Sequence, residues 1–333
     1  MTETWRYATL SHCWGLLQIS RLLTTNQAEF KQGIRVSTLQ PTFQHAIRVV
    51  AMLGLRYLWI DSFCILQDSA TDWETESALM GKVYRHASVN IAATSSSDAR
   101  GGLFFDRDPD LVQPFVAYSA PANNANQIKM LEDGWYVWKN DMRWSRVGRE
   151  PLNLRGWVLQ ERLLSTRTVH FAKSEMVWHC LEDLASESVP YQFQSDLLAV
   201  PMNQIRDYTD IRIAIAAART EGHRISSQTR ARLYRDWRKV LAHYSKCGLT
   251  KETDKLVAIF GVADELEQLT GDWCLAGMWR SQMPSCLLWL VSWDTDSMDG
   301  KTIAPDESRR ELPAQWRAPS WSWASLELAI NYP

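Results

Sequence analysis

A carboxylate and a hydroxyl group directly follow an apolar run in the first third of the chain. The run at residues 57–60 is too short for a typical helix, and it is typical of a parallel strand covered on both faces. Asp61 and Ser62 come next and therefore lie at the carboxyl edge of the predicted sheet. Open α/β sheets bind ligands outside that edge, so we expect both residues to line a site. An Asp that only caps the turn is the alternative.

Two further predicted strands also end in polar residues. Ser11 and His12 follow a strand expected at residues 6–10, and Ser95 follows one expected at residues 88–93. A helical pattern separates the first two strands, which makes a βαβ unit with parallel strands and a right-handed crossover. Because parallel strands end at the same edge, the sequence predicts one pocket lined from all three strand ends.

A glutamate on the helix after the second strand is the candidate catalytic residue. This helix is predicted to begin near Thr71, which has capping-box spacing with Glu74. Glu76 falls near the middle of an apolar stripe formed by Trp73, Met80, Val83, Tyr84 and Ala87. A buried carboxylate is costly unless it is paired, protonated or exposed to a polar cleft, and such groups cluster at functional sites. A structural ion pair with Arg48 or Arg56 is the alternative.

A second helical carboxylate, Glu161, lies in a helix predicted over residues 153–164. It either forms an ion pair with Arg155 or Arg162, or it faces the same cleft as Glu76. The ion pair is the role that we expect for it.

Composition and charge exclude several classes of protein. The chain has 333 residues, of which 46% are hydrophobic, and 38 acidic against 36 basic residues leave a net charge of −2. The densest basic stretch, residues 224–239, is interleaved with apolar residues in a helical pattern, so we expect a solvated helix face and no nucleic-acid binding. No apolar run is long enough to span a membrane.

The six cysteines are scattered without paired spacing, which predicts reduced thiols and a cytoplasmic protein. His179 and Cys180 lack a second ligand pair at a spacing typical of zinc sites, so we expect no metal site.

The element pattern predicts an α/β domain over residues 1–180, with a parallel, flavodoxin-like sheet flanked by helices. Short extended pieces separated by turn residues predict a β-rich antiparallel insertion at 101–150. Polar residues with prolines predict a connection at 181–205. A mainly helical portion, 206–333, is expected to pack on the first domain. Near its end, residues 318–325 alternate in a pattern that predicts a strand with Trp321 and Trp323 on one face.

Several segments in this order resemble the fungal heterokaryon-incompatibility domain. The resemblance covers the first half of the chain, and two later segments, at 254–263 and 317–325, resemble segments that often follow this domain. The segments of the first half are YATLSHCWG (7–15), LQPTFQHAI (39–47), RYLWIDSFCILQD (56–68), DWETESALMGKVYRHA (72–87) and LRGWVLQERLLS (154–165).

This resemblance implies a fold distantly similar to Toll/interleukin-1 receptor domains and a role in fungal allorecognition. It implies an effector of programmed cell death that acts through self-association or a conformational switch, with protein partners. The alternative is a hydrolase that cleaves NAD or a related nucleotide as its substrate, with no required cofactor. The relatives that cleave NAD use a glutamate after a tryptophan, and Trp73 and Glu76 are similar to that pair. The chain has no G-x-G-x-x-G motif, so hydride transfer is not expected.

Overall fold

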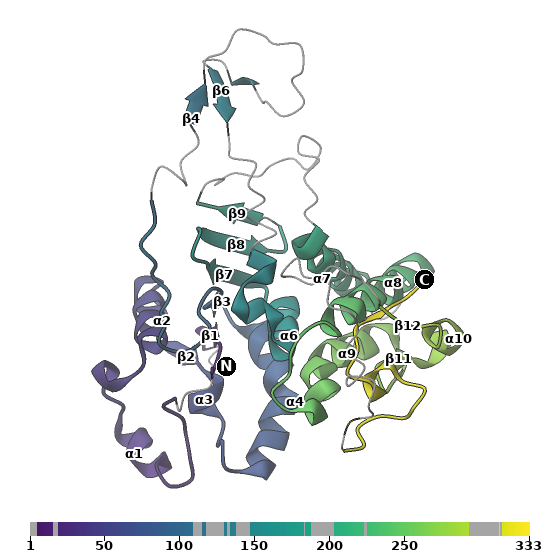
Figure 1. The fold of residues 1–333 in the computed structure, drawn as a ribbon, viewed down its shortest axis with the longest axis horizontal. Helices are drawn as coiled ribbons and strands as arrows, with labels where there is room; N and C mark the ends of the chain where they lie inside the picture. Colours follow the sequence, from purple (N-terminus) through teal and green to yellow (C-terminus); the bar gives the residue numbers. More distant parts are fainter. Residues whose placement is uncertain are drawn as a thin grey trace.

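The chain folds around a six-stranded sheet with the strand order β2-β1-β3-β7-β8-β9 (Figure 1). The computed structural model describes residues 5–15, 19–108, 115–117, 130–131, 134–137, 147–182, 184–187, 203–222, 225–292, 313 and 315–333. The first four strands in this order pair in parallel, and β8 and β9 extend the sheet in antiparallel fashion. The six strands are β1 (Tyr7–Ser11), β2 (Tyr57–Trp59), β3 (Val89–Ala92), β7 (Arg167–Phe171), β8 (Met176–Cys180) and β9 (Leu184–Ser186). The predicted α/β class, with a mostly parallel sheet flanked by helices, is therefore confirmed.

Two crossover helices cover this sheet and fix where its strands end. Helix α2 (Pro41–Met52) starts with a proline at its first turn and buries Phe43, Ala46, Val49 and Val50 at helical spacing. Helix α4 (Ala70–His86) connects β2 to β3. The hydroxyl oxygen of Ser69 accepts a hydrogen bond from the Asp72 amide, so Ser69 caps α4 and the predicted capping box at Thr71 and Glu74 is wrong.

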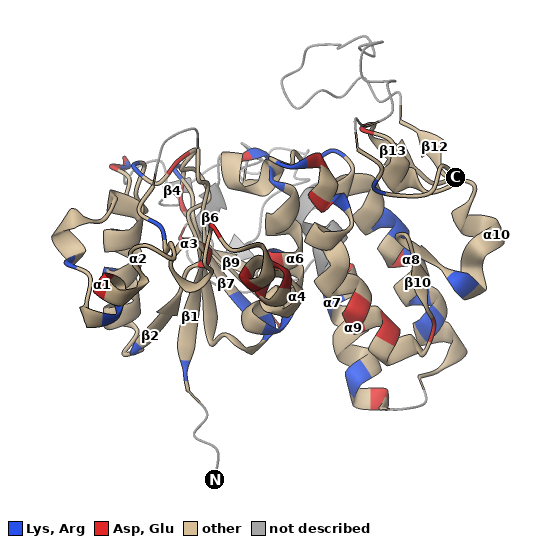
Figure 2. Ribbon diagram, turned by 90° about the horizontal axis from the view of Figure 1, so that it is seen from below, with Lys and Arg blue, Asp and Glu red and all other residues tan. Residues whose placement is uncertain are grey.

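The C-terminal part consists mainly of helices α7 (Asn203–Glu221), α8 (Ser227–Tyr244) and α9 (Val257–Thr270). Together with α6 (Gly156–Leu164), these helices enclose a core that contains the fully buried rings of Trp237, Trp279 and Trp323. Figure 2 shows the sheet part and the helical part side by side, with α4 and α6 between them and charges of both signs in each part. None of the described helices is both long enough and apolar enough to cross a bilayer.

Smaller elements complete the described residues. The β-rich insertion is present as an antiparallel sheet of β4 (Phe115–Ala117), β6 (Gly134–Val137) and β5 (Met130–Leu131). The remaining elements are α1 (Gln27–Gln32), η1 (Val36–Thr38), α3 (Asp61–Cys64), η3 (Pro151–Leu154), η4 (Glu252–Lys255), β10 (Cys274–Leu275), β11 (Met278–Trp279), η5 (Arg280–Gln282), α10 (Met283–Cys286), β12 (Leu290–Val291), η7 (Trp323–Ser325) and β13 (Ile330–Asn331).

Two predictions about the later part of the chain differ from the structure. Strand β9 lies inside the predicted connection 181–205, most of which is outside the described residues, and it pairs with β8 at the edge of the main sheet. Residues 318–325 form turns and η7 instead of a strand, because the Ser322 hydroxyl caps η7 and donates to the Ala276 carbonyl. The two rings therefore do not lie on one face as predicted: Trp321 is 41% exposed, whereas Trp323 is 0% exposed.

The helical part is joined to the sheet part by a close crossing of α4 and α9. A Cβ atom added at Gly81 would lie 3.0 Å from the Gly261 Cα atom and 3.0 Å from a methyl carbon of Leu164 on α6. The Gly261 amide donates to the Gln160 side-chain oxygen at 3.1 Å. The absence of side chains at both glycines therefore lets three helices meet at one point.

We predict that Gly261→Ala lowers the free energy of unfolding by about 1–3 kcal/mol, because the new Cβ atom overlaps the backbone of α4. That atom would lie 2.8 Å from Gln160 Oε1 and 3.0 Å from Gly81 Cα. Urea denaturation of the full chain measures the change. Gly248→Ala is the matched control, since its nearest neighbour would be 3.9 Å away. Equal stabilities of the two variants would contradict a tight crossing.

Candidate active site

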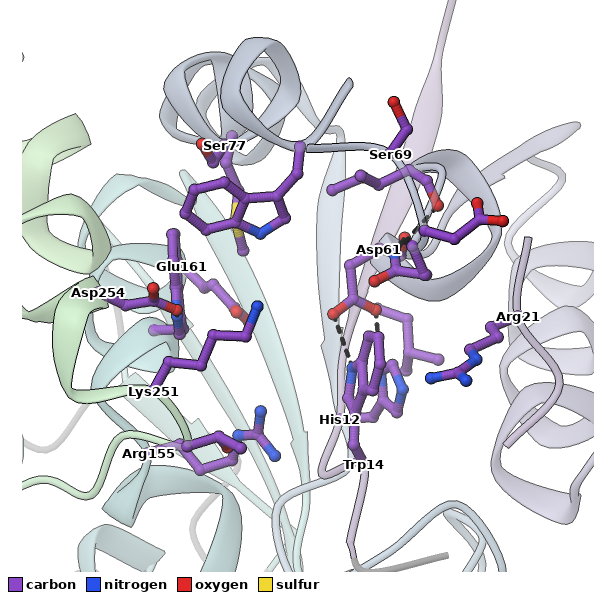
Figure 3. Close-up of a pocket in the computed structure, with 18 of the residues that line it drawn as sticks. His12, Trp14, Arg21, Asp61, Ser69, Ser77, Arg155, Glu161, Lys251 and Asp254 are labelled. Atoms are coloured by element: carbon purple, nitrogen blue, oxygen red, sulfur yellow. Dashed lines mark hydrogen bonds and ion pairs between the residues drawn. The ribbon is translucent and has the colours of Figure 1, made fainter. Parts of the chain in front are cut away.

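A cavity of about 610 Å³ opens at the carboxyl ends of β1 and β2, between the sheet part and the helical part (Figure 3). One wall comes from β1, α3 and the start of α4, and the other comes from α6 and the segment around η4. The lining includes His12, Trp14, Arg21, Asp61, Ser69, Trp73, Ser77, Tyr84, Arg155, Trp157, Glu161, Thr250, Lys251 and Asp254.

Asp61 is held in a fixed orientation at the end of β2. Its Oδ1 atom accepts a hydrogen bond from the Ser62 amide at 2.7 Å, and its Oδ2 atom accepts one from Trp14 Nε1 at 2.9 Å. The two bonds engage both carboxylate oxygens and so fix the plane of the group. Asp61 therefore lies at the carboxyl edge of the sheet and lines the cavity.

His12 lies beside Asp61, where its ring is buried. Its Nδ1 atom is 3.7 Å from Asp61 Oδ1, and its ring packs edge-on against Phe43. Burial lowers the pKa of His12, and the charge of Arg155 lowers it further, although the Asp61 carboxylate opposes both effects. His12 is therefore a neutral imidazole at neutral pH.

Glu161 on α6 is the buried carboxylate of this cavity. It is 6% exposed, and burial raises its pKa to about 7. The nearby negative charge of Asp61 also raises this pKa, whereas the Ser11 and Tyr84 hydroxyls and the charge of Arg155 lower it. Glu161 thus exchanges a proton near neutral pH, as a general acid or base must.

Two indole rings, one from each wall of the cavity, lie together with a lysine and an aspartate. The rings of Trp73 and Trp157 meet edge to face with centroids 6.3 Å apart, and Lys251 Nζ lies 5.8 Å from the centroid of Trp73. Trp157 Nε1 donates to Asp254 Oδ2 at 3.2 Å, which orients the indole. Aromatic faces of this kind suit a flat heterocycle.

Three cationic side chains bring positive charge to the cavity. Arg21, Arg155 and Lys251 all line it, and Figure 3 shows Lys251 and Arg155 extending from the Glu161 side toward Asp61. The amino end of α4, at Ser69 and Ala70, also faces the space. Helix amino ends and guanidinium groups bind phosphates, so the cavity offers sites for an anionic group beside its aromatic wall. Among the described residues, no group of three or more His, Cys, Asp or Glu could hold a metal ion.

Four of the predicted site residues line the cavity: His12, Asp61, Trp73 and Glu161. Two others are buried behind the lining residues. The Ser11 hydroxyl forms a hydrogen bond with the Glu161 carboxyl, which lowers the pKa of Glu161. Ser62 is fully buried. Ser95 lies elsewhere, where its hydroxyl accepts a hydrogen bond from the Lys173 amide at 2.7 Å.

Glu76 is not among the lining residues. It is half-buried on the flank of α4, whose buried residues are Ser77, Met80, Gly81 and Tyr84. Within the described residues, no salt bridge joins Glu76 to Arg48 or Arg56, whose guanidinium groups lie over the rings of Phe104 and Tyr57. The inward position predicted for Glu76 belongs to its neighbour Ser77, and its catalytic role stays a prediction.

Several residues of the site were not predicted from the sequence, among them Trp14, Trp157, Lys251 and Asp254. Trp14 lies in the motif YATLSHCWG with His12, and Trp157 lies in the motif LRGWVLQERLLS with Glu161. Their closeness in sequence to these candidate residues was the available signal. The positions of Lys251 and Asp254 depend on how a distant segment packs, so no local pattern indicated them.

Comparison with protein-family models matches residues 7–161 to the family described as Heterokaryon incompatibility protein (HET). This match confirms the resemblance that the sequence motifs indicated. Comparisons with curated proteins and with solved structures gave no match.

We predict that Glu161→Gln removes a pH dependence of stability. The pKa of Glu161 is raised from 4.5 to about 7 in the folded chain, so the protonated form favours folding. Stability is therefore lost as the pH rises from 4.5 through about 7, by roughly 3 kcal/mol in total. Urea denaturation at pH 5 and pH 8 should show a smaller loss in Glu161→Gln than in the wild type. An equal loss of stability between pH 5 and pH 8 in both proteins would contradict a Glu161 pKa raised by burial.

Proposed function

Because residues 7–161 of this chain match the heterokaryon-incompatibility family, we propose that the chain is an effector of fungal allorecognition whose activity arises in this cavity. The reaction that suits the cavity is hydrolysis of the glycosidic bond of NAD or a related nucleotide. The product of such a reaction, or the loss of NAD itself, would connect the chain to cell death. All six cysteines are free thiols, which favours the cytoplasm as the compartment.

The observation that carries this proposal is the buried Glu161 carboxylate, which faces a space lined by aromatic rings and cations. A dinucleotide has a flat base, a ribose and a diphosphate, and the cavity has a surface for each. The rings of Trp73 and Trp157 suit a base, and Arg155 and Lys251 suit phosphates.

In the proposed step, the bond between ribose C1′ and the nicotinamide nitrogen breaks, and its electron pair leaves with neutral nicotinamide. The ribosyl group becomes a cation, which the ionised Glu161 carboxylate stabilises. Water then adds to C1′ and transfers a proton to Glu161. A pKa near 7 suits this role, because the carboxylate can accept that proton and release it to solvent.

This proposal assigns the essential carboxylate to Glu161 and not to Glu76, which the sequence favoured. The two glutamates differ in position: Glu161 lines the cavity and is nearly sealed by protein, whereas Glu76 is half-buried and outside it. Their substitution therefore distinguishes the two assignments.

We predict that the purified full chain releases nicotinamide from NAD and that Glu161→Gln slows this release at least about 100-fold, since glutamine can neither carry the charge nor accept the proton. Glu76→Gln is the matched control and should retain wild-type turnover. Wild-type turnover should rise between pH 6 and pH 8 as Glu161 ionises. Chromatographic measurement of nicotinamide, on dilute and concentrated protein, checks each point. No turnover at any concentration would refute the hydrolase, and loss in Glu76→Gln alone would reverse the assignment.

A second candidate function is a switch driven by self-association, which can operate with or without hydrolysis. The observation that favours it is a group of exposed apolar side chains near α10, β12 and η7. Leu288 is 57% exposed and Leu290 is 59% exposed, and the adjacent Trp321 is also exposed. The Trp289 indole donates to the Trp321 carbonyl at 3.0 Å, which brings the segment before β12 next to the segment before η7. Exposed apolar surface of this kind is typical of protein contacts.

We predict that the chain forms dimers or larger assemblies as its concentration rises and that Leu288→Asp weakens them about tenfold or more, because a charge would lose water in the contact. Sedimentation velocity over a range of concentrations measures the effect. Leu79→Asp, on the exposed face of α4, is the control. A wild type that stays monomeric throughout would exclude this surface as a site of self-association.

A further inference from the structure

One wall of the cavity lies outside the family-matched residues. Thr250, Lys251 and Asp254 line the cavity, although the match ends at residue 161. Two backbone hydrogen bonds bring this segment to the start of α6: the Gly156 amide donates to the Gly248 carbonyl, and the Gly248 amide donates to the Leu154 carbonyl, both at 2.8 Å. The wall therefore contacts the matched part at its base.

The same segment is held from its other side by the C-terminal segment, residues 317–327. Lys255, next to Asp254, has a side chain that is only 4% exposed. Its Nζ atom donates to the Leu326 carbonyl and lies 3.7 Å from Glu327 Oε2. Burial lowers the pKa of Lys255 to about 7. Because this amino group is removed from water, these partners replace its hydration, and their loss would leave a buried polar group without a partner.

Arg317 connects the two segments a second time. Its side chain is 3% exposed and forms an ion pair with Glu327. Its Nη1 atom donates to the Glu252 carbonyl at 3.1 Å, and its Nε atom donates to the Ala324 carbonyl at 2.7 Å. One guanidinium group thus joins the backbone of η4 to that of η7.

The buried ring of Trp323 packs against the contact between η4 and the C-terminal segment. Trp323 is fully buried, and Lys255 Nζ lies 5.8 Å from its ring centroid. The Tyr244 ring packs edge-on against Trp323, and the Tyr244 hydroxyl donates to the Lys255 carbonyl at 2.7 Å. These contacts leave η4 with little freedom, because its backbone is bound on one side while Asp254 and Lys251 face the cavity on the other.

We infer that the C-terminal segment is a positioning device for the ligand site: Lys255 and Arg317 hold η4 so that Lys251 and Asp254 meet the nucleotide. This inference rests on the proposed function for the identity of the ligand. Lys255 and Arg317 do not line the cavity, so they are positioning residues and not catalytic ones. Lys251 supplies a cation for the phosphates, and Asp254 holds the Trp157 indole against the base.

The first test separates binding from chemistry in the full chain. Lys255→Met and Arg317→Met should raise the KM for NAD about tenfold and leave kcat within about threefold, since Glu161 stays on α6. Arg317→Lys, which keeps the charge beside Glu327, should fall between wild type and Arg317→Met. Lys31→Met, at an exposed lysine of α1, is the control and should match the wild type. A loss of kcat with unchanged KM would overturn the inference.

The second test needs no activity. Amide hydrogen exchange of residues 250–256 should accelerate about tenfold in Lys255→Met and Arg317→Met, while exchange in β1 and β3 stays the same. In the wild type, ADP-ribose should slow exchange at residues 250–256 and at residues 317–327 alike. Unchanged exchange at 250–256 in both variants would overturn the inference. If the wild type neither cleaves NAD nor binds ADP-ribose, the proposed function fails. The amide exchange of residues 250–256 in the two variants still decides whether the C-terminal segment holds this wall in place.

Discussion

The contact between Gly81 on α4 and Gly261 on α9 determines how the two parts of this molecule meet, and the cavity depends on it. Helix α4 begins at the cavity with Ser69, and η4 leads from the opposite wall directly into α9. The crossing of these helices therefore sets the distance between the walls. A larger residue at either glycine would separate the helix axes, because backbone atoms and Leu164 occupy the space around them.

Once the walls are placed, the electrostatics of the cavity follow from burial. Asp61 and Glu161 bring two carboxyl groups into one space, and their surroundings differ. Asp61 accepts hydrogen bonds from Trp14 and from the Ser62 amide, which hold it in one orientation. Glu161 is buried, and burial raises its pKa to about 7, so that this carboxyl group can exchange a proton near neutral pH.

The sequence predicted the sheet and its polar edge well, because local patterns determine both. A proline-initiated helix with helical spacing, a short apolar strand and a following Asp are all visible between residues 41 and 61, and β1, α2, β2 and Asp61 lie where the patterns put them. The position of Glu76 was not predictable to one residue, because packing against α6 and α9 decides which face of α4 is buried, and on that face Ser77 takes the inward position. Glu161 was harder to assign for a different reason: from Val158 to Leu164 every residue of α6 is buried, so no periodic stripe distinguishes one face. Lys251 and Asp254 reach the site through packing between segments almost one hundred residues apart, as in the Trp157–Asp254 hydrogen bond, and no local rule encodes such contacts.

The boundary of the family match and the boundary of the folded unit do not coincide, and the packing explains why. Helix α6 carries the last matched residue, Glu161, yet its Leu163 and Leu164 belong to the same apolar core as Trp237 and Val262 of the helical part. A fragment that ended after the sheet would expose this face of α6 to water, and each leucine would lose roughly 1.5–3 kcal/mol of burial. The matched segment therefore supplies Asp61 and Glu161, and the rest of the chain supplies both the apolar support for α6 and the wall that carries Lys251 and Asp254. A cavity assembled in this way is open to control, because any partner that shifts the helical part must also move the wall that faces Glu161.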